Sequence, residues 1–456
     1  MRKFWCFFIL LLMTGCARYH PLPLTAEAEQ RALKGPDLQT LVVKASRLKH
    51  PLLKPLPLNL RDGLSPDEAA LLAVVANPDL RAIRDEKKIA AAQVLEAGLL
   101  PNPRLAAEYE SPTGGETQDT VKAYRLELSW EITELLLRSA RLSSARARKA
   151  AVDLTVAWKE WQVAEAAKLH TLRLLWLQRK YALLGRVAGE RRKRLLLIRK
   201  AVALGEKTAL DLSAARAACQ EIKLQLASIR EKEIRERSAL MRLLGLPPGT
   251  PLRLEREKGL SSWPPLPEKK RLLSGLSRRR LDLVALKMTY RAQDARLRAE
   301  VLSQFPRIEV GILRARDIED VLTAGFTLSI ELPFLNRQQS RIALARATRE
   351  KLYHEYLARL FSARGEVVEI LERMALLQQK IAVSQRTVAG LREVLRTYRL
   401  ALRQGNVDLL SYYQLEDEFL KRRLELLDLY RLRNELGVAL ELASGIYIPV
   451  EGRNVR

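Results

Sequence analysis

The sequence predicts a mainly helical protein that also contains four β-strands. The chain has no proline between Pro112 and Pro247 or between Pro333 and Pro449, and its composition is that of long packed helices. Two stretches in which apolar and polar residues alternate predict one β-hairpin in each half of the chain. Both features occur twice, so we expect one elongated body of two similar halves.

An internal repeat connects the two halves. Residues 121–205 align without a gap to a second copy 200 residues downstream, so that Gly205 matches Gly405 and an RxxxARA motif at 141–147 matches one at 341–347. A constant offset over such a length indicates a duplicated structural unit. The expected divisions are a first repeat at 65–250, a linker at 251–265, a second repeat at 266–444 and a tail at 445–456.

The N-terminus resembles a bacterial lipoprotein leader. Two basic residues precede a ten-residue apolar run at 4–13, which is followed by Cys16. Such a run is too short to span a bilayer but fits a secretory signal. The resemblance implies a signal peptide at 1–15 and lipidation of Cys16, and an ordinary signal peptide is the alternative. Because Ala17 and not Asp follows the cysteine, the resemblance also implies the outer membrane.

Residues 16–64 are expected to form an extended, lipidated arm that lies on the body. This segment is rich in proline and leucine and shows no helical or strand period. A helix should begin after Ser65, which suits an N-cap and precedes a proline. A second helix is expected at 79–98, because Pro78 interrupts the first one.

Each half contains a predicted β-hairpin, at 104–130 and at 307–332. In the first, Leu126, Leu128 and Trp130 share one face, and charged or small polar residues share the other. This alternation is typical of a transmembrane β-strand, although a soluble sheet with one wet face gives the same pattern. Four strands cannot close a barrel, and an open edge in lipid leaves backbone groups unsatisfied, so closure has to come from other subunits.

Each half also contains a predicted hairpin of two long helices. The expected helices are 137–204 and 209–244 in the first half, and 337–404 and 409–443 in the second. At ~1.5 Å per residue the longer ones reach on the order of 100 Å, and we expect coiled-coil packing. Gly205 and Gly405 suit tight turns that end a helix, at the far end from the strands.

The composition argues against several classes of function. The net charge of +26 suggests nucleic acid, but the basic residues are spread among Glu and Asp in helical runs and no nucleic-acid-binding motif accompanies them. The sequence contains no catalytic triad, phosphate loop or metal-ligand cluster, so we expect no enzyme, no cofactor and no metal site. Cys219 is expected to be a buried, small apolar residue.

Together, the paired β-hairpins, the long helices with glycine turns, the NPDL motif at 77–80 and the leader resemble the TolC-type outer-membrane efflux proteins. The resemblance covers nearly the whole chain after Ser65. It implies a homotrimer in which each subunit gives four strands to a twelve-stranded membrane β-barrel, while the helices form an α-helical barrel in the periplasm. It also implies a periplasmic adaptor protein and an inner-membrane efflux pump as partners.

The implied function is a passive conduit for small-molecule export, with the energy supplied by the pump. Two alternatives are a periplasmic coiled-coil scaffold and an adaptor lipoprotein. The duplicated hairpins argue against a scaffold. An adaptor would need one α-hairpin joined to lipoyl-like and barrel domains.

The resemblance also implies where the functional site lies. In this family the periplasmic aperture is formed by the two glycine turns and the residues just after them. Matching the glycines assigns to it Gly205, Asp211, Gly405, Asp408 and Ser411. A ring of carboxylates favours cations in a narrow pore, but Ser411 stands where the best-known member has an aspartate. The alternative is that Asp211 and Asp408 simply cap the returning helices.

The basic run at 191–200, just before Gly205, has two interpretations. It is either a solvated helix face or a surface that helps to recognise the adaptor or anionic surfaces near the aperture.

Overall fold

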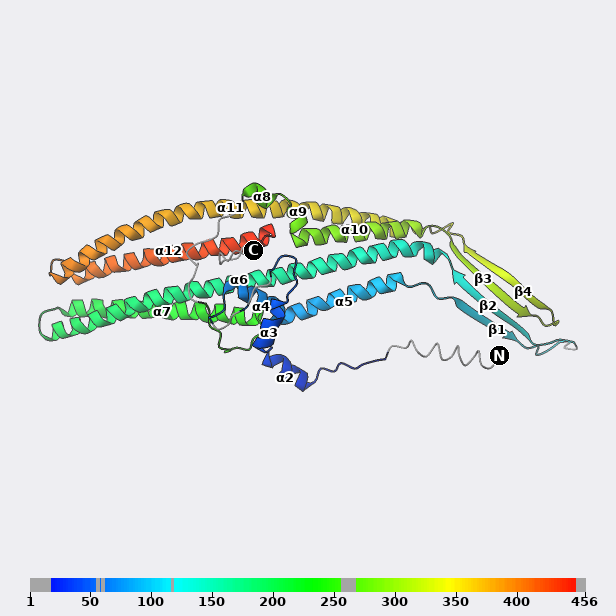
Figure 1. Cartoon of the computed structure of the whole chain (residues 1–456), viewed down its shortest axis with the longest axis horizontal. Coiled ribbons are helices and arrows are strands. Elements are labelled where there is room, and N and C mark those ends of the chain that lie inside the picture. The colour runs from blue at the N-terminus through cyan, green and yellow to red at the C-terminus, as the bar shows by residue number, and fades with distance from the viewer. Residues whose placement is uncertain (1–17, 55–57, 59–61, 116–118, 256–267, 448–456) are drawn as a thin grey trace.

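The computed structural model is an elongated body of long helices that ends in a small sheet (Figure 1). It describes residues 18–54, 58, 62–115, 119–255 and 268–447. The predicted signal peptide, Cys16 and most of the predicted linker lie outside these residues. None of the helices in the described ranges is long and apolar enough to cross a membrane.

The N-terminal arm contains two helices, α2 (Ala26–Lys34) and α3 (Leu38–Ser46), so the expectation of an extended segment is wrong there. Thr25 and Asp37 accept hydrogen bonds from backbone N–H groups in the first turns of these helices. Two buried residues of α3, Leu41 and Ala45, belong to the main hydrophobic core. The helices are only nine residues long, which hides their period among the surrounding prolines.

Two further helices, α4 (Pro66–Ala76) and α5 (Pro78–Gly98), follow at the expected places. Ser65 and Glu68 form a reciprocal capping box at the start of α4. Asn77 ends α4 and caps α5, because its Oδ1 accepts a hydrogen bond of 3.0 Å from the Leu80 N–H. A single Asn-Pro pair thus stops one helix and starts the next.

Two long helical hairpins lie side by side and reverse at the end far from the sheet (Figure 1). The first pairs α6 with α7 and the second pairs α11 with α12, and α10 packs between α6 and α11. The short helices α8 and α9 precede α10. The bounds of the helices from α6 to α12 are α6 Thr133–Ala203, α7 Ala209–Leu243, α8 Lys269–Leu273, α9 Leu276–Arg279, α10 Leu281–Leu302, α11 Gln339–Arg403 and α12 Leu409–Ser444.

The long helices pack with a seven-residue period. Buried residues recur at every seventh position on α11, namely Val367, Met374, Ile381, Val388 and Leu395. A strict heptad repeat of apolar residues produces left-handed supercoiling of the helices. The expectation of coiled-coil packing therefore agrees with the burial pattern.

The four strands form one antiparallel sheet in the order β1-β2-β3-β4. The strands are β1 Arg104–Glu110, β2 Ala123–Glu131, β3 Arg307–Arg316 and β4 Leu322–Glu331. β2 of the first repeat pairs with β3 of the second, so the sheet joins the two halves. The prediction of a mainly helical chain with four strands is confirmed. Among the described residues, no further strand pairs with the outer side of β1 or β4.

Midway along the body, a buried ionic cluster joins helices from both halves. The Lys168 Nζ on α6 lies 3.0 Å from Asp67 Oδ1 on α4 and 2.8 Å from Glu441 Oε1 on α12. Glu165, one turn before Lys168, is also buried. Burial and the nearby Glu441 carboxylate raise the pKa of Glu165 well above its usual range.

Candidate functional site

The two glycine turns have the same backbone geometry. Each glycine has a positive φ, 77° at Gly205 and 78° at Gly405, which a residue with a Cβ adopts only with strain. The Glu206 N–H donates to the Ala201 carbonyl, and the Asn406 N–H donates to the Ala401 carbonyl, both at 2.9 Å. This six-to-one hydrogen bond is the Schellman motif, which satisfies carbonyls at the end of a helix.

The side chains after each glycine cap the returning helix. Thr208 and Asp211 form a capping box at the start of α7. At the start of α12 the order is reversed, because Asp408 is the N-cap and accepts hydrogen bonds from both the N–H (2.9 Å) and the hydroxyl (2.6 Å) of Ser411. Asp408 and Asp211 therefore do cap helices, which was the alternative interpretation of these residues.

Both capping carboxylates stay ionised near neutral pH. Hydrogen bonds from Thr208 lower the pKa of Asp211, and those from Ser411 lower the pKa of Asp408. Asp408 is exposed and Asp211 is partly exposed. Capping thus leaves two negative charges at the ends of the helical hairpins.

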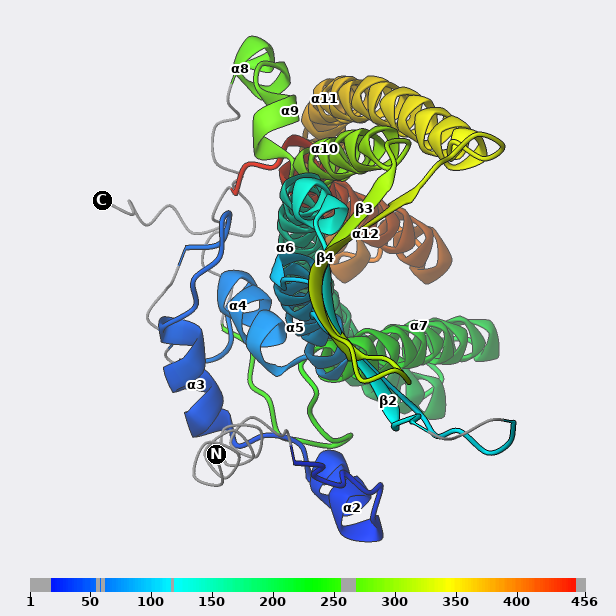
Figure 2. The ribbon, with the colours of Figure 1, turned by 90° about the vertical axis from the view of Figure 1, so that its right-hand side faces the viewer.

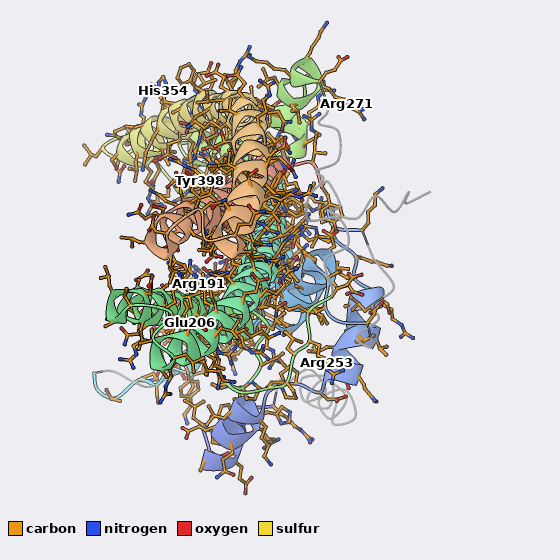
Figure 3. The ribbon with its side chains drawn as sticks, turned by 90° about the vertical axis from the view of Figure 1, so that its left-hand side faces the viewer. Arg191, Glu206, Arg253, Arg271, His354 and Tyr398 are labelled. Carbon is orange, nitrogen blue, oxygen red and sulfur yellow. The ribbon has the colours of Figure 1, made fainter. Side chains whose placement is uncertain are left out.

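A buried ionic cluster lies close to the glycine turns and joins the two helical hairpins. Its residue Arg191 is labelled in Figure 3. The Arg191 Nε on α6 donates to Glu416 Oε2 on α12 at 3.0 Å, and its Nη1 donates to the Ala218 carbonyl on α7 at 3.1 Å. Its Nη2 is also hydrogen-bonded to Asp417. Burial alone would lower the pKa of Arg191, but Asp417 and Glu416 outweigh it and raise that pKa.

Arg194 and Tyr412 complete this cluster. The Arg194 guanidinium lies 4.7 Å from the centre of the Tyr412 ring, and its Nη2 is 3.3 Å from Glu416 Oε1. The Tyr412 hydroxyl donates to the same carboxylate at 3.0 Å. Burial and the Glu416 charge raise the pKa of Tyr412, so it remains a neutral donor. We call Arg191, Arg194, Tyr412 and Glu416 the tip cluster.

The tip cluster corrects one interpretation of the basic run at 191–200. Arg191 is fully buried and therefore does not belong to a solvated face, whereas Arg192 and Lys193 are exposed. The sequence does contain a signal for this burial. Arg191 lies at the same seven-residue spacing as the buried residues Leu177, Leu184 and Ile198 on α6. A charged residue at such a position needs a buried partner.

The sheet separates apolar from polar side chains. On one face, the register aligns Leu128 with Ile312 and Ile312 with Phe326. Leu128, Ile312 and Phe326 are all exposed, and the exposed fraction of Phe326 is 91%. On the other face, Ser129 donates to Glu309 at 2.5 Å. Exposed apolar and polar faces on one sheet match a strand pattern that faces lipid on one side only.

Glycine is required at one position of the polar face. A Cβ at Gly311 would lie 2.5 Å from Thr327 Oγ1 and 2.9 Å from the Leu128 carbonyl.

In the part of the chain that the structure describes, no group of His, Cys, Asp and Glu side chains could hold a metal ion. Cys219 is buried, as expected.

Comparison with known proteins finds one family that resembles the second half of the chain. Residues 272–445, which include β3, β4, α11 and α12, match the family model described as outer membrane efflux protein. This part of the chain is therefore similar to the outer membrane efflux proteins. The resemblance to TolC-type efflux proteins that the sequence predicted is thereby confirmed. No curated protein matches the chain significantly in sequence.

Solved structures of outer-membrane proteins extend the likeness to both repeats. CusC is 19% identical and covers 91% of this chain and 99% of its own, with a TM-score of 0.69. The outer-membrane channel OprN is 16% identical and covers 94% and 98%, with a TM-score of 0.71. VceC from Vibrio cholerae is 18% identical and covers 83% and 96%, with a TM-score of 0.70. The chain therefore shares the fold of these proteins along most of its length.

Proposed function

We propose that the chain is the outer-membrane channel of a tripartite efflux system and that three copies form one passive conduit for small molecules. In this arrangement the sheets close a twelve-stranded β-barrel in the outer membrane. The helical hairpins form a tunnel in the periplasm. The observation that carries the proposal is the sheet, which has two unpaired edges and one exposed apolar face.

The sheet edges support closure by other copies of the chain. Backbone groups along β1 and β4 need hydrogen-bond partners, because lipid offers none. β1 and β4 are different surfaces, so β1 of one copy would pair with β4 of the next. Head-to-tail contacts of this kind form a closed ring when the rotation between copies is right.

Exposed apolar side chains on the helices support the same arrangement. On α5, Ile89 and Leu95 are 60% and 68% exposed. On α11, Leu344 and Phe361 are 68% and 81% exposed. α5 continues into the β1 edge and α11 follows the β4 edge. Copies that join through the strands would therefore cover these two helices as well.

The turns would then form the periplasmic aperture, with Gly205 and Gly405 at its rim. Asp211 and Asp408 would place carboxylates there, and Ser411 would contribute a hydroxyl instead of an acid. Widening the aperture would require the two hairpins to separate, which the tip cluster opposes through the contact between Arg191 and Glu416. A partner that binds the open arrangement more tightly would shift the population towards it.

The remaining parts of the system are a periplasmic adaptor and an inner-membrane pump that supplies the energy. The chain would be held in the outer membrane by its barrel and by lipid on Cys16, and would extend into the periplasm. A mass spectrum of the mature N-terminus tests the lipid. A lipid adduct on Cys16 that disappears in Cys16→Ser is expected, and an unmodified N-terminus would exclude the anchor.

Disulfide trapping between the edges tests the ring directly. Cysteine at Ala106 on β1 would be combined with cysteine at each of Thr323, Thr327 and Ser329 on β4. We expect oxidation of membranes to give covalent dimers and trimers for at least one pair. Ala106→Cys combined with Glu127→Cys is the control, because the neighbouring β2 holds Glu127 within the same sheet. Monomer alone in every pair would refute the ring and favour a periplasmic scaffold.

A further inference from the structure

The positive charge of this chain includes two exposed basic segments at mid-height that come from distant parts of the sequence. Residues 38–61 and residues 269–281 contain no Asp or Glu, as is also true of residues 166–189 and 191–205 on α6. The first segment includes α3 and the second includes α8 and α9. Eight exposed cations in these segments form what we call the basic band: Lys44, Arg47, Lys49, Lys54, Lys269, Lys270, Arg271 and Arg278.

The basic band lies at one level of the body. Leu41 and Ala45 of α3 share a hydrophobic core with Trp158 and Leu281. Arg280, at the end of α9, lies with its guanidinium 5.4 Å from the centre of the Trp158 ring. Both acid-free segments therefore pack at the height of Trp158 on α6, although more than 200 residues separate them in sequence.

The band also lies on one side of the body. α3, α8 and α9 lie on the side opposite to α7 and α12 (Figure 2). α8 stands out from α11, and the labelled Arg271 lies on this projecting helix (Figure 3). Apolar residues under the surface, Leu272 and Leu276, hold the projecting segment in place. The Arg279 guanidinium donates to the carbonyls of Arg271 and Leu272, which fixes the link between α8 and α9.

The cations of the band have no acidic partner within the residues that the structure describes. None of the eight is in an ion pair, whereas Arg280 beside them pairs with both Asp282 and Glu366. Unpaired like charges at close range repel one another and raise the free energy of the folded chain. A surface that retains them suits an anionic partner.

The distance of the basic band from both ends of the body limits which anionic partner it can contact. α10 has 22 residues, so its ~1.5 Å rise per residue separates the band from the sheet by about 33 Å. α12 has 36 residues and separates it from the aperture turns by about 54 Å. Membrane phosphates and a partner docked at the turns are both several Debye lengths away at physiological salt. The partner must lie in the middle of the periplasm, beside the channel.

We propose that the basic band binds the peptidoglycan of the cell wall through the free carboxylates of its stem peptides. This inference rests on the proposed outer-membrane placement, which puts the band inside the periplasm. Three copies of the band would surround the channel as a ring. Such a ring would hold the helical tunnel where it passes through the wall.

Co-sedimentation with isolated peptidoglycan sacculi tests the inference on the purified, detergent-solubilised full-length protein. The two test variants are K44Q/R47Q/K49Q/K54Q and K269Q/K270Q/R271Q/R278Q. The charge-matched control is R192Q/K193Q/R199Q/K200Q, which removes four exposed cations near the turns. A second probe is sacculi whose carboxylates have been converted to amides.

We expect wild type and the control to sediment with sacculi, and each test variant to lose at least about tenfold in retention. Amidated sacculi and high salt should both abolish retention of the wild type. Equal losses in the control and the test variants, or full binding to amidated sacculi, would overturn the inference. The native mass and the need for detergent are measured in parallel, so failure of the proposed channel is recognised separately.

Discussion

Arg191 on α6 and Glu416 on α12 are buried together, with the Arg191 Nε donating to Glu416 Oε2 at 3.0 Å. The two residues are 225 positions apart in sequence and come from different repeats. Their contact ties the hairpins together just inside the glycine turns. Breaking one partner of such a buried pair costs about 3–5 kcal/mol, because the other charge is left uncompensated.

Arg191→Gln should therefore weaken the closed arrangement of the tips. We expect a higher mean conductance in planar bilayers than for wild type, because the hairpins separate more easily. Arg192→Gln is the matched control, since Arg192 is the exposed neighbour in sequence. Equal conductance of the two variants would show that the tip cluster does not restrain the aperture.

The glycine turn predicts a local effect at Gly205. Gly205→Val should cost about 1–2 kcal/mol, because φ is 77° and a β-branched residue is strained there. Hydrogen exchange of the Glu206 amide should become roughly tenfold faster. Gly205→Asn should stay close to wild type, because Asn tolerates this conformation. Unchanged exchange in Gly205→Val would contradict the turn geometry.

The ionic cluster around Lys168 and Glu165 predicts that the stability of the folded chain depends on pH. The raised pKa of Glu165 means that the folded chain retains a proton which the unfolded chain releases above about pH 4.5. The stability contributed by this proton is fully present below that pH and is lost as the pH rises towards the raised folded pKa. Glu165→Gln should remove this slope, so its melting temperature should exceed that of wild type increasingly from pH 5 to pH 9.

Glu86→Gln serves as the control for this measurement, because Glu86 is exposed on α5. It should follow the wild-type curve. Parallel curves for Glu165→Gln and wild type would mean that Glu165 is ionised in the folded chain.

The close packing around Gly311 on the polar face of the sheet predicts that a larger residue there disturbs the sheet. A methyl group in Gly311→Ala would meet the Leu128 carbonyl at 2.9 Å, and overpacking of this kind costs about 1–3 kcal/mol. We expect a lower yield of assembled protein in outer-membrane fractions. Gly325→Ala on β4 is the control, since its Cβ would have no atom closer than 4.0 Å. Equal yields of both variants would contradict the close packing at Gly311.

The long elements were predictable because each has a strong local signal. The absence of proline and the glycines at 205 and 405 indicate the helical hairpins, and period-two alternation indicates the strands. Ser65 was predictable as an N-cap for the same reason, since the residues that form its capping box are neighbours in sequence.

The features that were missed depend on contacts between distant residues. α3 is stabilised by burial of Leu41 and Ala45 in a core shared with α6, which the local sequence does not show. The partner of Arg191 is a residue of the other repeat, so a run of basic residues resembles a solvated face until α12 is placed beside it. For Asp211 and Asp408, the capping geometry is visible in one chain, whereas a role at an aperture belongs to several chains together.

The native mass of the protein, extracted in detergent from the outer-membrane fraction, tests the central claim most directly. Closure of the sheet between copies predicts a particle of three chains that detergent alone releases. A monomer, or protein that high salt releases without detergent, would contradict the channel and leave a periplasmic scaffold as the better explanation.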